Sequence, residues 1–240
     1  MRKAQTLLLI VCGLLLSFGS AFAYPAQVII IRHGEKPADP NLTQLDPQGC
    51  VRAFSLPSFF QTNSVVNQFG PPAAIYSPQL GRDGGTFRPQ ETISPTAIAL
   101  HLQIHAQFSE IEFSGVVNDI MNRKEYDGKT VILSWEHHNI PALAKEFGLS
   151  LPPEAQVWPG HVFDEAWVIK FSGPRQVSSF QIVPEHVLLT DNPKGDLSSW
   201  GKKQKFPESD PCYTDQQNLV DLCQNNDHLE MIRKTALQPL

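Results

Sequence analysis

The feature that most restricts the fold of this chain is an uninterrupted apolar run at residues 27–31, Gln-Val-Ile-Ile-Ile. Continuous β-branched runs of this length are typical of strands buried on both faces of a parallel sheet. The run ends directly at Arg32-His33-Gly34-Glu35, so the predicted strand delivers charged side chains at its carboxyl end. In open α/β sheets, ligands bind at that end of the strands.

Further apolar runs and helical patterns alternate along the chain. The runs occur at 73–76, 130–135 and 166–169, and the helical patterns at 48–60, 89–103, 115–123 and 140–147. Strands that alternate with helices indicate the α/β class. We therefore expect a three-layer sandwich in which helices cover both faces of a mostly parallel central sheet.

The first 23 residues have the pattern of a secretory signal peptide. Arg2 and Lys3 precede an apolar stretch of about ten residues, which is shorter than the ~20 needed to cross a bilayer, and small residues follow at Ala21 and Ala23. We expect cleavage after Ala23, a periplasmic or secreted product, and no membrane association after cleavage. A permanent anchor is the alternative.

The mature chain, residues 24–240, is long enough for one domain with a large core. From about residue 184 the pattern gives way to Pro, Gly, Asp, Lys and Ser, with one short helical pattern at 215–223, which predicts an irregular C-terminal covering segment. In an oxidising compartment Cys212 and Cys223 are natural partners for a disulfide, which leaves Cys50 as a small buried residue.

The charge balance restricts the partners. The chain carries a formal charge of −5, and removal of Arg2 and Lys3 lowers it by two, to −7. Because nucleic acids are bound by clustered Lys and Arg, and this chain contains no such block, we expect no nucleic-acid partner. A phosphate site must then be a local pocket. The oligomeric state is not readable from the sequence.

Three of the predicted strand exits carry polar residues suited to phosphoryl transfer. They are Arg32-His33-Gly34 after the first strand, Arg88 beyond the second, and Glu136-His137-His138-Asn139 after residues 130–135. The reaction needs a nucleophile, positive charge around the equatorial oxygens, and a proton for the leaving oxygen. An imidazole can supply the nucleophile, and guanidinium groups can supply the charge.

On these residues the sequence resembles the histidine phosphatase superfamily, which has the phosphoglycerate mutase-like fold and Arg-His-Gly after its first strand. Residues 45–53, Leu-Asp-Pro-Gln-Gly-Cys-Val-Arg-Ala, are similar to the Leu-Thr-x-x-Gly-x-x-x-Ala opening of the family's first helix, with Asp46 in place of Thr. The resemblance covers roughly residues 27–171. It implies a cofactor-independent phosphatase in which His33 takes the phosphoryl group and Arg32, Arg88 and His137 hold it.

Two of these assignments have named competitors. The Arg88-Pro89-Gln90-Glu91-Thr92 segment is similar to the family's Arg-x-x-x-Thr, and Pro89 marks a helix start. Arg82 lies nearer the strand but lacks such a start. His138 stands where the family usually has a small residue, so either His137 or His138 can face the pocket.

The proton donor is the least determined role. The segment Phe108-Ser109-Glu110-Ile111-Glu112-Phe113 does not match the longer family segment in which many members carry an acidic donor. Glu136 is the candidate, because it lies beside His137 at a strand exit where burial can keep a carboxyl protonated. Strand alternation argues against it. Glu35, Asp164 or no donor at all are the alternatives.

The sequence predicts an exported enzyme that hydrolyses phosphate monoesters or phosphoramidates and acts on a small phosphorylated substrate or a phosphoprotein. One alternative is a protein of the same fold that binds a phosphorylated ligand without turnover. Another is a metallohydrolase with ligands among Glu136, His137, His138, His161 and Asp164, although neighbouring His137 and His138 on a strand would splay apart. We interpret Arg52 as a solvated helix residue, and His101, His105, His186 and His228 as ordinary structural or surface histidines.

Overall fold

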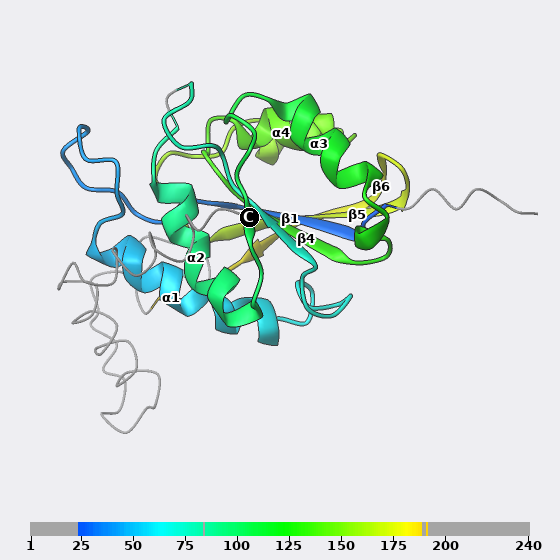
Figure 1. The fold of residues 1–240 in the computed structure, drawn as a ribbon, viewed down its shortest axis with the longest axis horizontal. Helices are drawn as coiled ribbons and strands as arrows, with labels where there is room; N and C mark the ends of the chain where they lie inside the picture. The colour runs from blue at the N-terminus through cyan, green and yellow to red at the C-terminus, as the bar shows by residue number, and fades with distance from the viewer. Residues whose placement is uncertain (1–23, 84, 189–190, 192–240) are drawn as a thin grey trace, which may run out of the picture.

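The computed structural model describes residues 24–83, 85–188 and 191. Its centre is a six-stranded sheet with the strand order β3-β2-β4-β1-β5-β6 (Figure 1). The strands are β1 (Gln27–Arg32), β2 (Ala74–Tyr76), β3 (Ile104–His105), β4 (Thr130–Trp135), β5 (Glu165–Gly173) and β6 (Gln176–Pro184). The four predicted strands are confirmed as β1, β2, β4 and β5.

Strand β1 lies inside the sheet, between β4 and β5. It pairs in parallel with β4 and antiparallel with β5, and every residue of β1 is buried. The β2–β4 and β2–β3 pairings are also parallel. The mostly parallel sheet expected from the sequence is confirmed, with an antiparallel edge formed by β5 and β6.

Strand β6 is absent from the sequence prediction. Most of its residues are exposed or half-buried, because it is an edge strand with β5 on one side only. Its sequence, Gln-Val-Ser-Ser-Phe-Gln-Ile-Val-Pro, therefore lacks the continuous apolar run by which the inner strands were recognised.

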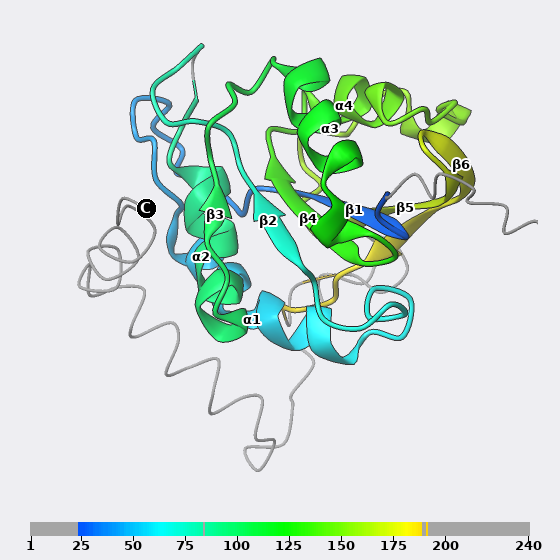
Figure 2. The same ribbon diagram turned by 45° about the vertical axis from the view of Figure 1, so that its right-hand side comes forward.

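Helices cover both faces of the sheet, as predicted. In Figures 1 and 2 α1 (Pro47–Thr62) and α2 (Arg88–Leu100) lie on one face, and α3 (Phe113–Asn122) and α4 (Ile140–Glu146) lie on the other. Alternate residues of β1 supply the two cores. Ile29 and Ile31 pack with the α1–α2 layer, while Val28 and Ile30 pack with the α3–α4 layer. Two short 3₁₀ helices, η1 (Lys124–Tyr126) and η2 (Pro153–Ala155), complete the elements.

Local signals set the two helix starts nearest the site. The Asp46 side chain accepts a hydrogen bond from the Gly49 amide at 2.8 Å and so caps α1, whose first residue is Pro47. Helix α2 begins at Arg88, with Pro89 in its first turn. Both helices contain a second proline inside their predicted span, Pro57 and Pro95, and continue through it.

Several expectations concern residues outside the described ranges. The signal peptide, the Cys212–Cys223 pair and the helical pattern at 215–223 all lie there. Cys50, by contrast, is described: it is buried against Val51 and Leu188 and is disulfide-bonded, so the expectation that it stays unpaired is wrong.

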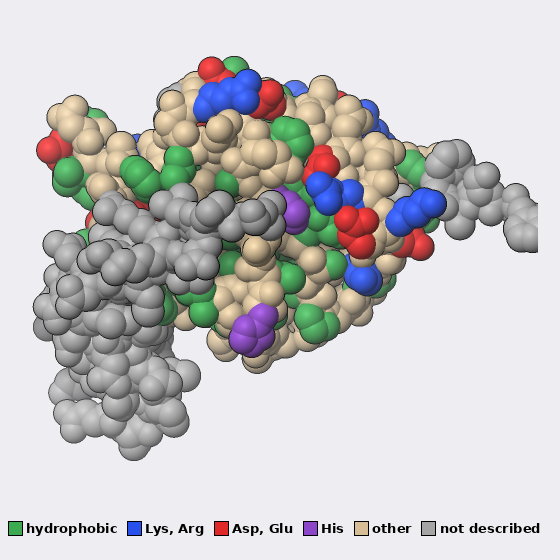
Figure 3. Space-filling model, viewed as in Figure 1, with side chains coloured by type: hydrophobic (Ala, Val, Ile, Leu, Met, Phe, Trp, Pro, Cys, Tyr) green, Lys and Arg blue, Asp and Glu red, His purple; other side chains and the backbone are tan. Residues whose placement is uncertain are grey.

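Within the part of the chain that the structure describes, no helix combines the length and the apolar character needed to span a bilayer. On the face seen in Figure 3, Lys and Arg side chains alternate with Asp and Glu and do not gather into a block.

Candidate functional site

The candidate site lies where the neighbouring parallel strands β1 and β4 end. Arg32 is in register with Trp135, so the residues that follow them leave the sheet side by side. The amide of His33 donates a hydrogen bond to the Trp135 carbonyl at 3.1 Å and continues this pairing by one residue. We call His33, Arg32, Arg88, Glu136 and His137 the His33 site.

The His33 imidazole is held in one orientation. It is almost completely buried, and its Nδ1 atom lies 2.6 Å from the Gly34 carbonyl oxygen. Since a carbonyl only accepts, Nδ1 carries a proton and donates it. The second nitrogen, Nε2, faces the Glu136 carboxylate at 3.2 Å. His33 thus presents Nε2 to the centre of the site.

Gly34 is fixed from three sides. Its carbonyl accepts from His33, and its amide donates to the Thr92 hydroxyl of α2 at 2.8 Å. The Gly34 backbone also touches α1, because a Cβ on Gly34 would lie 2.9 Å from the Gly49 carbonyl oxygen. Only glycine permits this close approach.

Arg32 holds a loop with one arm of its guanidinium group. Its Nη1 donates to the Gly160 and Val162 carbonyls at 2.9 and 2.7 Å, and its Cζ lies 3.7 Å from the centre of the Phe163 ring. Its Nε and Nη2 atoms are buried and have no hydrogen-bond partner among the described residues. Burial lowers the pKa of Arg32 to about 10, so the group stays positively charged at neutral pH.

Arg88, and not Arg82, is the second arginine near His33. Its Nη1 donates to the Leu42 carbonyl at 2.9 Å, and its Nη2 lies 3.8 Å from Glu136 Oε1. Its Nε is buried without a hydrogen-bond partner in the described part of the chain. Arg82 is half-exposed and forms an ion pair with Glu112 at 3.1 Å.

Glu136 is turned toward the nucleophile. Strand β4 ends at Trp135, so Glu136 lies in the turn before α4, where strand alternation no longer applies. Burial alone would raise the pKa of Glu136, but its hydrogen bond to His33 and the charges of His33, Arg88 and His137 outweigh burial and lower it to about 2.

Of the two adjacent histidines, His137 is the buried one and His138 is exposed. The ring centres of His33 and His137 are 6.4 Å apart. Burial, helped by the charges of Arg32 and His138, lowers the pKa of His137 to about 4. The expectation that His137 and His138 splay apart is wrong: they lie in a turn after β4, and their ring centres are 3.8 Å apart.

Glu110 is a further acidic residue that the sequence analysis left without a role. Its side chain hydrogen-bonds to Asn139, and its carbonyl accepts from Trp135 Nε1 at 2.9 Å. Burial, and secondly the charge of Glu136, raise the pKa of Glu110. The sequence shows an acidic residue within residues 108–113, but its contact with the end of β4 arises only in the tertiary fold.

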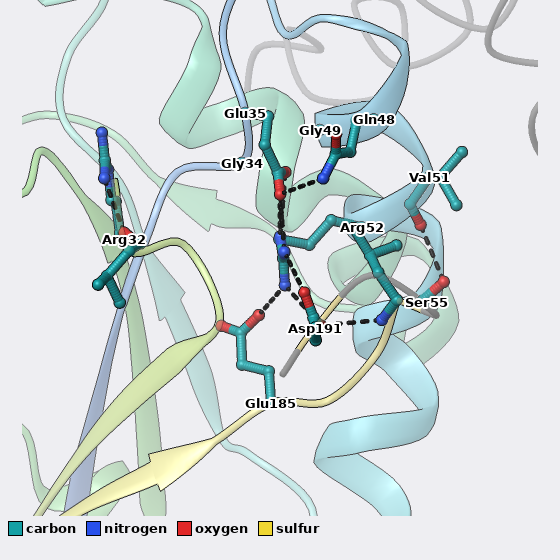
Figure 4. Close-up of polar contacts among 12 residues, drawn as sticks. Arg32, Gly34, Glu35, Gln48, Gly49, Val51, Arg52, Ser55, Glu185 and Asp191 are labelled. Carbon is teal, nitrogen blue, oxygen red and sulfur yellow. Dashed lines mark hydrogen bonds and ion pairs between the residues drawn. The ribbon is translucent and has the colours of Figure 1, made fainter. Parts of the chain in front are cut away.

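Neither alternative donor is paired with His33. Glu35, together with Glu185, binds the buried Arg52 (Figure 4). Burial and the charge of Asp191 raise the pKa of Asp164. His161, the proposed metal ligand, is exposed.

One group of described residues has the spacing to hold a cation. Ligand atoms of His33, Glu136 and His137 lie within 4.8 Å of one another. Of the ligands that the metallohydrolase alternative proposed, only Glu136 and His137 belong to this group. His138, His161 and Asp164 do not, and the third member, His33, was not among the proposed ligands. Arg32 and Arg88 bring two positive charges next to it, which opposes a dication and favours an anion.

No family model and no curated protein matches this chain. Several solved structures do. A mycobacterial glucosyl-3-phosphoglycerate phosphatase with inorganic phosphate matches at 13% identity over 66% of this chain and 95% of its own, with a TM-score of 0.43. A phosphoglycerate mutase from Plasmodium falciparum matches at 13% identity over 67% and 90%, with a TM-score of 0.43. A putative phosphohistidine phosphatase from Agrobacterium tumefaciens matches at 14% identity over 66% and 99%, with a TM-score of 0.39.

The matched structures belong to the histidine phosphatase superfamily, which the sequence of this chain resembles. At these identities and TM-scores, the likeness carries no assignment of activity.

Proposed function

We propose that this chain is an exported phosphatase that hydrolyses phosphate monoesters through a covalent phosphohistidine on His33. One observation carries the proposal. Three buried guanidinium nitrogens, Arg32 Nε, Arg32 Nη2 and Arg88 Nε, have no hydrogen-bond partner among the described residues, and they belong to the two arginines that flank His33 and Glu136. Buried donors without partners are costly, and an anion with several acceptor oxygens satisfies them.

The geometry favours phosphate over other anions. Guanidinium groups present forked donors that match the oxygens of a phosphoryl group. His137 adds Nδ1, a further buried ring nitrogen without a hydrogen-bond partner in the described part of the chain. Donors placed in this way stabilise the charge that develops on the equatorial oxygens during transfer.

In the first step, His33 Nε2 attacks phosphorus while the bond from phosphorus to the leaving oxygen breaks. The hydrogen bond from Nδ1–H to the Gly34 carbonyl keeps the lone pair on Nε2 and stabilises the positive charge that the ring gains. Burial of the ring keeps bulk water away from Nε2.

The leaving oxygen needs a proton, and we assign it to Glu136. In the free site His33 Nε2 and Glu136 Oε2 face each other at 3.2 Å, so a proton between them can be bound by either atom. When that proton is on Glu136, the imidazole is a nucleophile and the carboxyl is an acid. A bound phosphate dianion favours this form, because like charge raises the pKa of a carboxyl. Glu110, with its raised pKa, is the competing donor.

In the second step, water attacks phosphorus and the bond from phosphorus to Nε2 breaks. The carboxylate left by the first step accepts a proton from the water, and inorganic phosphate is released. Acid, nucleophile and base are thereby restored.

The export component of the proposal rests on the amino-terminal pattern described above. The substrate component is broad: a small phosphorylated compound or a phosphoprotein outside the cytoplasm. The solved structures that match include proteins named as a glucosyl-3-phosphoglycerate phosphatase and a putative phosphohistidine phosphatase.

The test is to trap the intermediate. Mature protein incubated with a ³²P-labelled aryl phosphate and quenched in alkali should carry acid-labile, base-stable label, as expected for phosphohistidine. His33→Ala should carry none and should lose turnover by several orders of magnitude. Full activity of that variant would overturn the proposal.

Two further measurements separate the alternatives. A protein that only binds phosphate would retain phosphate affinity but release no product from the aryl phosphate in a single turnover. A metallohydrolase would lose activity with a chelator and regain it with a divalent cation, whereas the phosphohistidine route requires no change with chelator.

A further inference from the structure

Arg52 lies in α1 and is buried, so its interpretation as a solvated helix residue is wrong. Only 2% of its side chain is exposed. All three guanidinium nitrogens are engaged by carboxylates of Glu35, Glu185 and Asp191 (Figure 4). We call these four residues the Arg52 cluster.

One side of Arg52 holds the loop that carries the nucleophile. Its Nε donates to Glu35 Oε2 at 3.0 Å, and its Nη2 donates to Glu35 Oε1 at 2.7 Å. This paired contact fixes the plane of the carboxylate as well as its position. Glu35 directly follows Gly34, whose carbonyl oxygen accepts the Nδ1 proton of His33.

The backbone near Glu35 is held against the same helix. The Asp46 amide donates to the Glu35 carbonyl at 3.1 Å, and a Cβ on Gly49 would lie 2.4 Å from that oxygen. The 34–35 peptide unit is thus clamped between α1 and the Arg52 side chain. A rotation of this peptide would move the Gly34 carbonyl away from His33.

The other side of Arg52 holds the segment after β6. Nη1 donates to Glu185 Oε2 at 3.1 Å, and Nη2 donates to Asp191 Oδ1 at 2.7 Å. These partners lie 133 and 139 residues away in the sequence. Arg52 therefore has two separable roles. It holds the loop that follows His33 through Glu35, and it holds the segment after β6 through Glu185 and Asp191.

We propose that Arg52 is a positioning residue for the nucleophile: through Glu35 it fixes the Gly34 carbonyl that orients the His33 imidazole. This inference rests on the proposed function of His33. Rates of phosphoryl transfer depend steeply on the placement of the attacking atom, and a displacement of about 1 Å can cost 10²-fold. Phosphate binding through Arg32 and Arg88 does not depend on that placement.

The two roles of Arg52 can be tested separately with a matched pair of variants. Glu35→Ala releases the nucleophile loop but leaves Arg52 paired with Glu185 and Asp191, so the buried cation stays compensated. Asp191→Asn removes one of the two charges that pair Arg52 with the C-terminal segment, the other being Glu185, and leaves the paired contact with Glu35. Arg52→Lys keeps the charge and loses the fork, which makes it the conservative third variant.

The measurements are the single-turnover rate of His33 phosphorylation and the dissociation constant of inorganic phosphate. Glu35→Ala should slow phosphorylation on the order of 10- to 100-fold and change phosphate binding by less than about threefold. Arg52→Lys should fall between wild type and Glu35→Ala. Asp191→Asn should phosphorylate within about threefold of the wild-type rate. The slowing should be equal for p-nitrophenyl phosphate and for an alkyl phosphate, because positioning acts on the nucleophile and not on the leaving group.

Three outcomes would overturn the inference. A Glu35→Ala rate equal to that of wild type, or a larger loss in Asp191→Asn than in Glu35→Ala, would make Arg52 a docking residue alone. A much larger loss with the alkyl phosphate would make Glu35 a proton donor. The absence of label on wild-type His33 would instead refute the proposed function, so the two failures are distinguishable.

Discussion

His33 Nε2 and Glu136 Oε2 lie 3.2 Å apart, and the other ring nitrogen of His33, Nδ1, donates a hydrogen bond to the Gly34 carbonyl. At this distance a proton between the two atoms can be bound by either group. With the proton on His33 the site is an ion pair, and with the proton on Glu136 it is a nucleophile beside an acid. The pKa of Glu136, lowered to about 2 by its hydrogen bond to His33 and by nearby charges despite burial, keeps this carboxyl ionised in the unliganded site, and a phosphate dianion nearby raises that pKa toward the acid form.

The first prediction concerns the proton donor. A carboxyl that protonates the leaving oxygen matters little for p-nitrophenolate, which leaves without a proton, and matters greatly for an alkoxide. Glu136→Gln should therefore slow the hydrolysis of an alkyl phosphate by about 10²- to 10⁴-fold and the hydrolysis of p-nitrophenyl phosphate much less. Glu110→Gln is the matched variant. If Glu110→Gln shows the leaving-group dependence and Glu136→Gln does not, the donor is Glu110.

The second prediction separates the two arginines by inhibition with vanadate. Arg88→Ala should raise the inhibition constant by about 10²-fold, because it removes a mostly buried donor beside the reacting oxygens. Arg82→Ala should change it by less than twofold, since Arg82 is half-exposed and paired with Glu112, a surface contact worth about 0–1 kcal/mol. A larger effect of Arg82→Ala would show that the second phosphate-binding arginine is assigned wrongly.

The third prediction is a dependence of stability on pH that His137 causes. The pKa of His137 is about 4 in the folded protein and 6.5 ordinarily, so between these values the unfolded chain binds a proton that the folded chain does not. The stability contributed by neutral His137 is complete above about pH 6.5 and is lost as the pH falls toward 4. As the pH falls through this window, the free energy of unfolding measured in urea should decrease more steeply for wild type than for His137→Gln. Parallel curves for the two proteins would contradict the assignment.

The fourth prediction concerns processing. The Tyr24 backbone nitrogen lies 3.3 Å from the Asp127 carboxylate, so cleavage after Ala23 would place a new α-ammonium group beside a negative charge. The mass of the exported protein should correspond to an amino terminus at Tyr24. A membrane-bound product that retains Met1 would show that residues 1–23 act as an anchor.

The sequence by itself determined the layers of the fold and the location of the site at the ends of the strands. The β-branched runs specified β1 and β4, because a strand buried on both faces must be apolar at every position. The polar residues that follow these runs then had to meet at one edge of the sheet. Pro89 marked the start of α2 and with it the placement of Arg88, since proline fixes the backbone of a first helical turn.

Only the tertiary structure decided what depends on distant partners. Arg52 has a charged side chain on a helix and looks solvated, but Glu185 and Asp191 compensate its charge from more than a hundred residues away. Burial, and secondly the charge of Glu136, which follows a strand later in the chain, raise the pKa of Glu110. Local patterns report how each segment buries its own surface. The burial and pairing of a charge depend on what the completed fold brings against it, and no local pattern contains that information.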